Sequence, residues 1–430
     1  MQTEPKRVGN RLKKYVTLSL IVILFLIGCN ADERSSTSDE NSEENKTEPI
    51  QTEEVDGELI EPNNLFGFEL FHEVEPQQDN IFISPLSAYT ALLLAYNGAD
   101  GETKQEMAKT LHIENKRTDE VNEAMLQLTK LLQKDEEQME LSLANSIWLN
   151  DDYHFATDFS EIATNYFLAQ HETIDIKDDA SVDVINDWVV DATNGKITEM
   201  MEKPLSPDFL AVILNAIYFN GKWKYPFDEA NTEEASFYRE NEQITVPFMM
   251  LEEKMAYLEN EIFQAVQLPY GSGEMSMQIY LPKENISEAE FFDQLTEENW
   301  TIWNSEFQLI SGTIKLPKFQ VEYETSLNNG LKNLGIQLAF EKNRAEFPNL
   351  IEEDERIYIH EVKQKTYIDV KEEGTEAAGV TSVEVRLTSA IIDEETFYME
   401  VNRPFFFLIK DEETNAILFM GYIKNPKQGS

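Results

Sequence analysis

Residues Tyr367 to Ser389 read Tyr-Ile-Asp-Val-Lys-Glu-Glu-Gly-Thr-Glu-Ala-Ala-Gly-Val-Thr-Ser-Val-Glu-Val-Arg-Leu-Thr-Ser. The first part of this stretch alternates and is rich in β-branched residues, which is typical of a half-buried strand. The middle, Gly374 to Gly379, consists of small residues and one glutamate, with a glycine at each end where the backbone can bend. Alternation then resumes as far as Leu387. This pattern predicts a segment that is a loop in one state and a strand in another.

The alternation also predicts which side chains of this segment would enter a core. In a strand, alternate residues share a face, so six uncharged side chains would point inward: Thr375, Ala377, Gly379, Thr381, Val383 and Val385. Ser382, Glu384 and Arg386 would lie on the opposite face, where charge is tolerated. A strand from Thr375 to Arg386 would span roughly 40 Å at ~3.3 Å per residue.

Composition and charge exclude several classes of function. The chain has 430 residues, of which 41% are hydrophobic, so it can bury a large core. Its formal charge of −46 repels phosphate backbones, and we therefore expect no nucleic-acid partner. The five histidines are scattered without metal-ligand spacing, so the sequence indicates neither a metal site nor a cofactor. The only cysteine, Cys29, excludes an intramolecular disulfide.

The N-terminus has the organisation of a sorting signal. Five basic residues up to Lys14 precede an apolar run from Tyr15 to Ile27, which is too short to span a bilayer comfortably. Leu26-Ile27-Gly28-Cys29 resembles the lipobox of bacterial lipoproteins, which implies a signal peptide over 1–28 and a diacylglyceryl group on Cys29. We therefore expect a lipid anchor on the extracytoplasmic face of the cell membrane. The alternative is an ordinary signal peptide that happens to contain a cysteine.

The lipidated cysteine and the residues that follow it, 29–62, form a segment of distinct composition. Asn30 to Pro62 contains no aromatic residue and many acidic and hydroxyl side chains, so it cannot bury enough surface to order itself. We predict a disordered tether over 29–62 and a globular domain over 63–427.

The globular part begins mostly with helical patterns and continues mostly with strands. Ala88 to Asn97 is nearly all apolar and predicts a buried helix, and further helices are predicted at 155–169 and 291–303. Phe209 to Phe219 is continuous and apolar, as in a strand covered on both faces. The order predicts an α+β fold.

Several motifs in one order resemble the serpin family, the serine protease inhibitors. They lie between Leu65 and Pro426, and they are Asn80-Ile-Phe-Ile-Ser-Pro-Leu-Ser87, Asn186-Asp-Trp-Val189, Thr193-Asn-Gly-Lys-Ile197, Asn215-Ala-Ile-Tyr-Phe-Asn-Gly-Lys-Trp-Lys-Tyr-Pro-Phe227, Val246-Pro-Phe-Met-Met250, Leu316-Pro-Lys-Phe319, Asn402-Arg-Pro-Phe-Phe-Phe407 and Phe419-Met-Gly-Tyr-Ile-Lys-Asn-Pro426. Glu372-Glu-Gly-Thr-Glu-Ala-Ala-Gly379 resembles the hinge of the inhibitory members.

This resemblance implies a fold of about nine helices and three β-sheets with an exposed reactive-centre loop. It implies that the chain is no enzyme but a monomeric suicide inhibitor of serine proteases, with cysteine proteases as a second class. The protease forms a covalent acyl complex with the loop, which then inserts as a new strand into the central sheet. The corresponding hinge residues are Glu372, Gly374, Thr375, Glu376, Ala377, Ala378 and Gly379.

The sequence leaves more than one candidate for the peptide bond that the protease cleaves. Counting from the hinge as in the family gives Thr388-Ser389, which favours elastase-like or subtilisin-like proteases with small apolar pockets. Arg386-Leu387 is the alternative and suits a trypsin-like pocket, although alternation places Arg386 on the outer face. Counting back from Pro404 points nearer to Asp393, so the register stays open.

The resemblance also assigns a sheet-opening region. Ser84, Ser87 and Asn215 match its polar cluster, and Trp223 matches the tryptophan where the loop enters, although plain packing would also explain these residues. Gln364 occupies a position where the family commonly has a histidine, and glutamine cannot titrate near neutral pH.

Two rival functions differ in what they require of the sequence. A non-inhibitory serpin acting as a cell-surface binding module would usually have a bulky, charged or proline-bearing hinge. A lipid-anchored hydrolase would need a triad or a metal constellation. The segment Glu120 to Lys134 carries only two lysines, with acidic residues in it and directly after it, which does not favour a heparin-type cofactor.

Overall fold

The computed structural model describes residues 57–74, 80–132, 138–240, 242–375 and 396–427. Within these ranges the α-helices are α1 Ile60–Glu73, α2 Pro85–Gly98, α3 Gly101–Thr110, α4 Thr118–Leu132, α5 Thr157–Asn165, α6 Ala180–Ala192, α7 Glu288–Phe292, α8 Glu297–Glu306 and α9 Asn328–Leu334. Short 3₁₀ helices are η1 Gly57–Leu59, η2 Glu229–Asn231 and η3 Leu338–Phe340.

The strands are β1 Ile81–Ile83, β2 Met139–Asn150, β3 Gln170–Ile174, β4 Ala211–Lys222, β5 Glu233–Tyr238, β6 Gln243–Glu259, β7 Phe263–Tyr270, β8 Met275–Pro282, β9 Gln308–Pro317, β10 Phe319–Ser326, β11 Ile359–Lys371, β12 Gly374–Thr375, β13 Thr396–Glu400, β14 Phe405–Asp411 and β15 Ile417–Ile423. Helices dominate the first half of the described chain and strands the second, which confirms the predicted α+β class.

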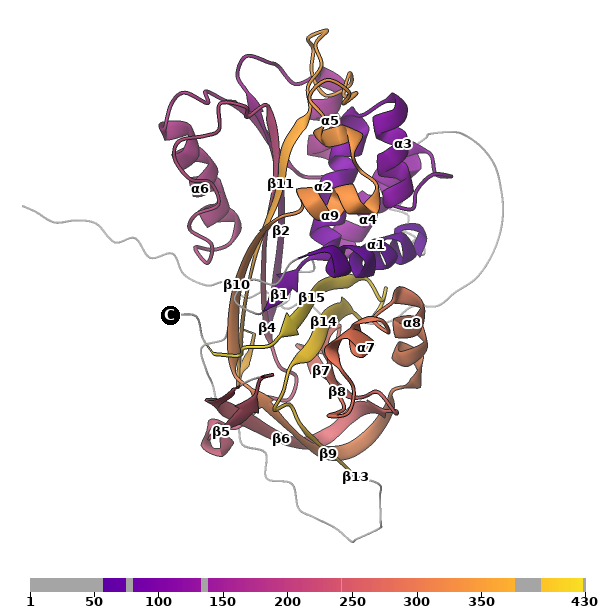
Figure 1. The fold of residues 1–430 in the computed structure, drawn as a ribbon, viewed down its shortest axis with the longest axis vertical. Helices are drawn as coiled ribbons and strands as arrows, with labels where there is room; N and C mark the ends of the chain where they lie inside the picture. The colour runs from indigo at the N-terminus through magenta and orange to yellow at the C-terminus, as the bar shows by residue number, and fades with distance from the viewer. Residues whose placement is uncertain (1–56, 75–79, 133–137, 241, 376–395, 428–430) are drawn as a thin grey trace, which may run out of the picture. The chain divides into compact units, whose positions relative to one another are not determined.

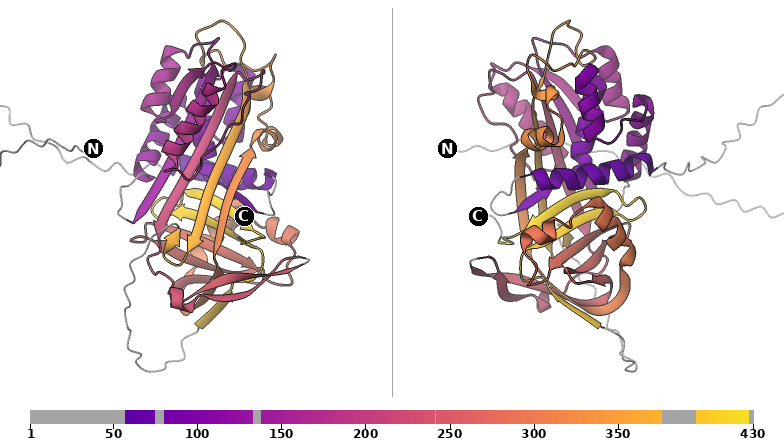
Figure 2. Two further views of the ribbon diagram at one scale, coloured as in Figure 1. Left: turned by 90° about the vertical axis from the view of Figure 1, so that its left-hand side faces the viewer. Right: turned by 45° about the vertical axis from the view of Figure 1, so that its right-hand side comes forward.

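Six strands form the sheet that we call the main sheet, in the order β10-β11-β12-β4-β2-β3. Figure 1 shows α6 alone on one side of this sheet, with α2 to α5 on the other, and the left view in Figure 2 shows α6 in front of the strands. Under α6, Val212 and Leu214 of β4 pack with Ile185 and Val189 of the helix. Ile213 and Ile217 of β4 belong to the larger core on the opposite face. Both faces are therefore covered, as the continuous apolar run predicted.

The remaining nine strands form one continuous second sheet, in the order β1-β15-β14-β8-β7-β6-β9-β13, with β5 paired to β6. The resemblance led us to expect three sheets, whereas the hydrogen bonds join two of them into this one. The reason is the length of β6, which pairs with β5 up to Phe248, with β9 from Phe248 to Tyr257 and with β7 from Ala256 to Glu259.

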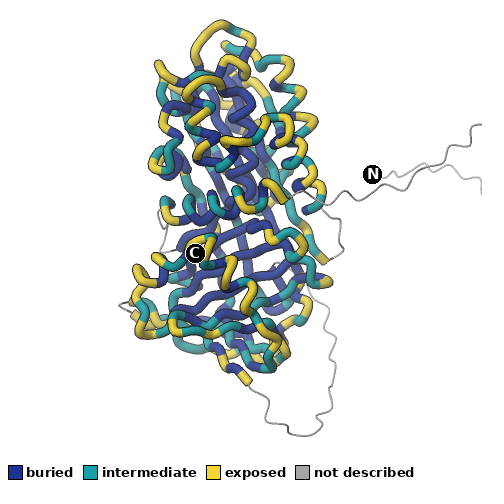
Figure 3. Tube along the Cα trace, turned by 90° about the vertical axis from the view of Figure 1, so that its right-hand side faces the viewer, coloured by how far each residue is buried: buried dark blue, intermediate teal, exposed yellow. Residues whose placement is uncertain are grey.

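The residues of α2 are all buried. Local sequence signals explain where α2 begins. Ser84 is the N-cap residue, the Ser84 side chain accepts a hydrogen bond from Ser87 N, and Pro85 occupies the first turn. In Figure 3 dark blue, buried residues fill the interior, and exposed residues gather on the outer segments and turns. The predicted buried helix is therefore confirmed, and it supports the main sheet from behind.

Some predicted boundaries differ from the structure. The predicted helix 155–169 is shorter, because α5 ends at Asn165. The predicted helix 291–303 is two helices, because Thr296 caps a new helix by accepting a hydrogen bond from Asn299 N. Residues 57–62, which we assigned to the tether, are helical, and Leu59 is buried in the core.

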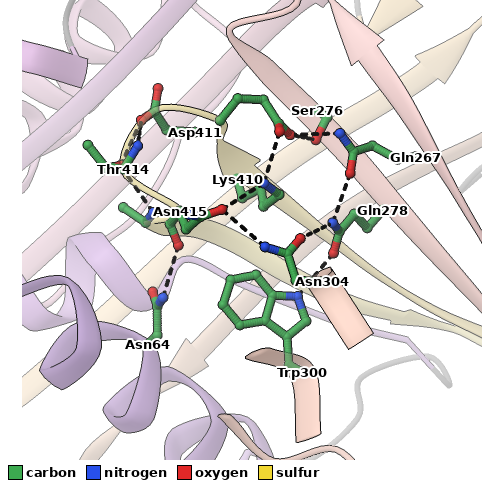
Figure 4. Close-up of polar contacts among 12 residues, drawn as sticks. Asn64, Gln267, Ser276, Gln278, Trp300, Asn304, Lys410, Asp411, Thr414 and Asn415 are labelled. Atoms are coloured by element: carbon green, nitrogen blue, oxygen red, sulfur yellow. Dashed lines mark hydrogen bonds and ion pairs between the residues drawn. The ribbon is translucent and has the colours of Figure 1, made fainter. Parts of the chain in front are cut away.

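A polar network fixes the turn between β14 and β15 against α1 and α8 (Figure 4). The ammonium group of the buried Lys410 lies 2.9 Å from Asn415 Oδ1 and 3.0 Å from Glu412 Oε2. Asn304 of α8 donates to the same oxygen of Asn415, and Asn64 of α1 donates to Asn415 O. These bonds join three elements that lie far apart in the sequence.

Candidate functional site

The main sheet contains a seam, which we define as the parallel pairing of β4 with β11. Their paired residues run from Ile359 with Ala211 to Tyr367 with Tyr218, whereas β10–β11 and β2–β4 on either side are antiparallel. A parallel pair is slightly less stable per residue than an antiparallel pair. The seam is therefore a comparatively weak line through the middle of the sheet.

At one end of the seam, β12 lies between the two strands. Thr375 pairs with Val370 of β11 and with Gly221 of β4, in both cases antiparallel. Gly374 pairs with Lys371 and with Lys222 in the same way. The first two small residues of the predicted hinge are thus already strand residues, and both are buried.

Gly374 is required at its position for two reasons. Its φ of +152° lies in a region that side chains with a Cβ rarely adopt. A Cβ there would lie 2.2 Å from Gly221 O and 2.6 Å from the Lys222 Cα, both backbone atoms that cannot move aside cheaply. Only glycine lets the chain turn back into the sheet at this point.

Two aromatic rings cover the entry of β12. Trp223 stacks on Tyr270 with ring centroids 4.3 Å apart and an angle of 14° between the ring planes. Trp223 Nε1 donates to Lys371 O, and its backbone N–H donates to Glu373 O. The ring pair therefore holds the turn between β11 and β12 through its backbone.

Glu372 anchors the same turn by its side chain. It is 5% exposed, and it accepts hydrogen bonds of 2.8 Å from Lys318 Nζ and 2.8 Å from Thr232 Oγ1. Burial disfavours the charged carboxylate, but these hydrogen bonds outweigh burial and lower the pKa of Glu372 below its ordinary value. The carboxylate is therefore ionised at neutral pH, and it connects the turn after β11 with Lys318, between β9 and β10, and with Thr232, just before β5.

Two other carboxylate oxygens near this turn are buried without a hydrogen-bond partner among the described residues, Asp369 Oδ1 and Glu373 Oε2. The other oxygen of Asp369, Oδ2, forms an ion pair with Lys371 Nζ. Buried acceptors without donors are unfavourable, so these two oxygens offset part of the stabilisation that the other contacts give to this turn.

A buried polar cluster spans the middle of the seam. Gln364 Nε2 donates to Asn215 Oδ1 at 2.6 Å and to Ser84 O at 3.0 Å, while Gln364 Oε1 accepts from Ser84 N. Asn215 Nδ2 in turn donates to Ser87 Oγ and to Asn145 Oδ1. The cluster ties both strands of the seam to the start of α2.

The structure brings together four of the residues that the sequence assigned to sheet opening, namely Ser84, Ser87, Asn215 and Gln364, and it places Trp223 at the end of the seam next to Glu372, Gly374 and Thr375. The predicted hinge residues Glu376, Ala377, Ala378 and Gly379, the predicted cleaved bonds at Arg386, Leu387, Thr388 and Ser389, and the predicted lipidation site Cys29 lie outside the described residues.

Sequence reasoning missed three partners of this site. Asn145 joins the polar cluster, Lys318 pairs with Glu372, and Tyr270 contacts both Trp223 and Thr375. Asn145 and Tyr270 lie in β2 and β7, and Lys318 lies between β9 and β10. Each is far from its partner in the chain, so no local pattern marks the contact. In the described part of the chain, no three His, Cys, Asp or Glu side chains are grouped closely enough to hold a metal ion. None of the described helices combines the length and apolar character that a membrane span requires.

The comparison with protein families decides what this architecture is. Residues 61–426 match the serpin family, whose members are described as serine protease inhibitors. The chain belongs to the serpin family. Serpins are in general protease inhibitors rather than catalytic enzymes.

Relatives of this serpin cover almost the whole chain. It is 31% identical over 425 residues to a serpin-like protein of Methanosarcina mazei, which corresponds to 96% of this chain and 98% of the relative. Its structure is similar to the native state of the thermophilic serpin tengpin, with a TM-score of 0.81, 33% identity and coverage of 88% of this chain and 97% of tengpin.

A second structural neighbour of this serpin is thyroxine-binding globulin in complex with thyroxine. The TM-score is 0.77 at 26% identity, with coverage of 86% of this chain and 99% of the globulin. The predicted serpin fold is therefore confirmed. The same fold also occurs in a protein that binds a small molecule.

Proposed function

We propose that this serpin is a suicide inhibitor of serine proteases, with cysteine proteases as a second target class. The protease nucleophile attacks the carbonyl of the cleaved bond, so that an ester or thioester forms, the peptide bond breaks and the new amine leaves. The loop then enters the seam between β4 and β11 and carries the attached protease with it.

The observation that carries this proposal is the register of β12. Between Glu361 and Tyr367, beyond an irregularity at Ile359, each residue of β11 pairs with the β4 residue whose number is lower by a constant amount, as in Gln364 with Asn215. The β11 and β4 partners of Thr375, which are Val370 and Gly221, differ by that same amount. A strand that continues β12 can therefore enter by separating β4 and β11 sideways, and neither strand has to slide along the other.

Insertion also has a clear source of free energy. One parallel pairing is replaced by two antiparallel pairings, each slightly more stable per residue. Each ladder hydrogen bond contributes about 0.5–1.5 kcal/mol net, and the inward-facing apolar side chains add about 25 cal/mol per Å² of buried surface. The uncut chain is then a kinetically trapped state.

The register predicts where inserted residues would arrive. Continuing β12 residue by residue would place Ala377 beside Phe219 of β4, and Thr381 between Gln364 and Asn215. Thr381 would then bring a hydroxyl to the buried polar cluster, where donors and acceptors are available. This match between the sequence of the segment and its destination supports insertion along the whole seam.

We propose Thr388-Ser389 as the cleaved bond, with Arg386-Leu387 as the alternative. Thr388 favours an elastase-like or subtilisin-like target, and Arg386 a trypsin-like target. The target would be met outside the cell, because we propose that Cys29 carries a lipid that anchors the chain to the extracytoplasmic face of a bacterial membrane. The acidic segment 30–56 would then separate the inhibitor from that surface. We expect the inhibitor to act as a monomer.

The test is to mix the full-length chain, solubilised in mild detergent, with an elastase, a subtilisin and a trypsin. A band at the summed mass that survives boiling in denaturing gel buffer is expected with at least one protease. The mass of the released C-terminal peptide then identifies the bond, because the peptide begins at Ser389 or at Leu387. Cleavage without such a band, and without a gain in thermal stability, contradicts the proposal and favours a non-inhibitory binding module.

A further inference from the structure

The hinge is held in the main sheet by a side chain from the second sheet. The hydroxyl of Tyr270, at the end of β7, lies 2.8 Å from Thr375 Oγ1 of β12. Both residues are completely buried, at 0% exposure. The contact joins two sheets at the point where the inserted strand would start.

We propose that Tyr270 is a positioning residue that keeps the first two hinge residues in the sheet, so that loop insertion starts from a preformed end. The inference rests on the proposed inhibitory function and deepens it. Tyr270 touches neither the cleaved bond nor the protease, and it acts only through Thr375.

The burial of both hydroxyls makes their hydrogen bond hard to replace. If Thr375 withdrew from the sheet, Tyr270 would keep its hydroxyl in an apolar setting among Trp223 and Phe219, whose rings contact it. A buried hydroxyl without a partner is unfavourable. Burial also raises the pKa of Tyr270, so its hydroxyl stays neutral and keeps its proton. Withdrawal of the hinge is therefore opposed at all ordinary pH values.

The ring of Tyr270 is itself held rigidly. It stacks on Trp223, and Trp223 binds the backbone oxygens of Lys371 and Glu373 on either side of Glu372. The hydroxyl and the stacked ring therefore act on the same short turn from two directions. This arrangement fixes the direction in which the chain leaves β12.

The position of Thr375 affects how quickly loop insertion can start after cleavage. In the inserted strand Thr375 would keep its present partners, Val370 and Gly221, since the register of β12 agrees with that of the seam. Insertion then extends an existing strand and needs no new nucleation step. A faster start favours the trapped complex over hydrolysis of the acyl-enzyme, which releases active protease.

The first test variant is Tyr270→Phe, which removes the hydroxyl and keeps the stacked ring. Tyr280→Phe is the matched control, because Tyr280 is also 0% exposed and also has a hydrogen-bonded hydroxyl, which donates to Gln278 Oε1 at 2.7 Å. Two quantities are measured on the full-length chain: hydrogen exchange of the Gly374 and Thr375 amides without protease, and the moles of inhibitor consumed per mole of protease inactivated.

In Tyr270→Phe we expect exchange of the two amides to be about tenfold faster, as for the loss of one buried hydrogen bond. We expect the consumption of inhibitor to rise several-fold while the rate of loop cleavage stays unchanged. Tyr280→Phe should lower thermal stability by a similar amount and leave both quantities unchanged.

Thr375→Val tests the same bond from the other side, and it should speed exchange to the same extent. The double variant should be no worse than either single variant, because the bond is already lost. Unchanged exchange in both single variants overturns the proposal, and so does faster exchange with unchanged inhibitor consumption. Absence of any covalent complex in the unmodified chain overturns the proposed function instead, and the exchange measurement distinguishes the two failures because it needs no protease.

Discussion

The side-chain amide of Gln364 donates a 2.6 Å hydrogen bond to Asn215 across the seam, and the two residues are also direct partners in the register of β11 and β4. Both side chains are completely buried. A strand that enters between β4 and β11 must separate Gln364 from Asn215. The hydrogen bonds between Gln364 and Ser84 can remain in place. The bond therefore stabilises the closed sheet selectively.

We predict that Gln364→Ala and Asn215→Ala are coupled by about 1 kcal/mol in the uncut chain. The coupling should vanish in chain whose loop has been cleaved and inserted, because Thr381 then lies between the two positions. The measurement is a double-mutant cycle from urea unfolding of both forms. A coupling of equal size in both forms would show that the seam stays closed after cleavage.

We predict that Thr375→Arg converts the inhibitor into a substrate. Thr375 is completely buried between β4 and β11, so its replacement would place a guanidinium group in the sheet interior. The loop should still be cut, but the boiling-resistant complex should fall by at least about tenfold, since a buried unpaired charge is strongly unfavourable. Thr375→Ser keeps a small hydroxyl and is the control. Unchanged complex formation by Thr375→Arg would rule out insertion through this site.

Glu372 is predicted to make uncut-chain stability depend on pH. Hydrogen bonds from Lys318 and Thr232 outweigh burial and lower the pKa of Glu372, so the folded state binds this proton less readily than the unfolded state. Its contribution is therefore fully present above the ordinary carboxyl pKa of about 4.3, and it is lost as pH falls through the lowered value.

The corresponding variant is Glu372→Gln, which should lower the unfolding free energy at pH 7 by about 1–3 kcal/mol, because Lys318 loses a charged partner. The difference from the unmodified chain should shrink progressively below about pH 4. Thermal unfolding from pH 3 to pH 8 measures it. A difference that is constant over this range would mean that the carboxylate charge contributes nothing.

We predict that Lys410→Met lowers the unfolding free energy by about 1–3 kcal/mol, because it removes the buried ammonium group that pairs with the half-buried Glu412. Glu412 Oε2 would lose the ammonium group as its partner, and Asn415 Oδ1 would keep only the hydrogen bond from Asn304. Lys427→Met changes an exposed lysine and serves as control. Urea unfolding of both variants provides the comparison, and equal midpoints would show that the network in Figure 4 is not stabilising.

We predict that Cys29→Ser releases the chain from the membrane fraction of a bacterial host. The serine hydroxyl cannot replace the thiol that forms the thioether to the lipid, and the remaining chain is strongly acidic. Partition between detergent and water phases, with the mass of the N-terminal peptide, measures the change. Recovery of both forms in the membrane fraction, without added lipid mass on Cys29, would favour an uncleaved apolar segment instead.

Much of the strand content of the second half was predictable from apolar faces, but β10 was missed although its alternate residues Phe319, Val321 and Tyr323 are buried. Phe209 to Phe219 predicted β4 because both of its faces meet a core, one under α6 and one toward α2. The short edge strands β3, β5 and β13 escaped prediction, since partly exposed edge residues carry little hydrophobic pattern. The split between α7 and α8 was missed because the cap at Thr296 interrupts a sequence that is otherwise apolar at helical spacing.

The candidate site, too, was predictable from the sequence only in part. The small residues Gly374 and Thr375, the uncharged inward face and the glutamine at position 364 are local features, so the sequence by itself determined that this segment could enter a sheet and that its polar cluster cannot titrate near neutral pH. The order of the motifs likewise pointed to the family that the comparisons then showed.

Only the tertiary structure decided where that segment enters and what holds it there. The common register of β4, β11 and β12 depends on how three distant stretches pair, and the contact of Tyr270 with Thr375 joins residues from different sheets. No periodicity carries this information, because hydrogen bonding between sequence-distant strands is set by the packing of the whole core rather than by either stretch alone.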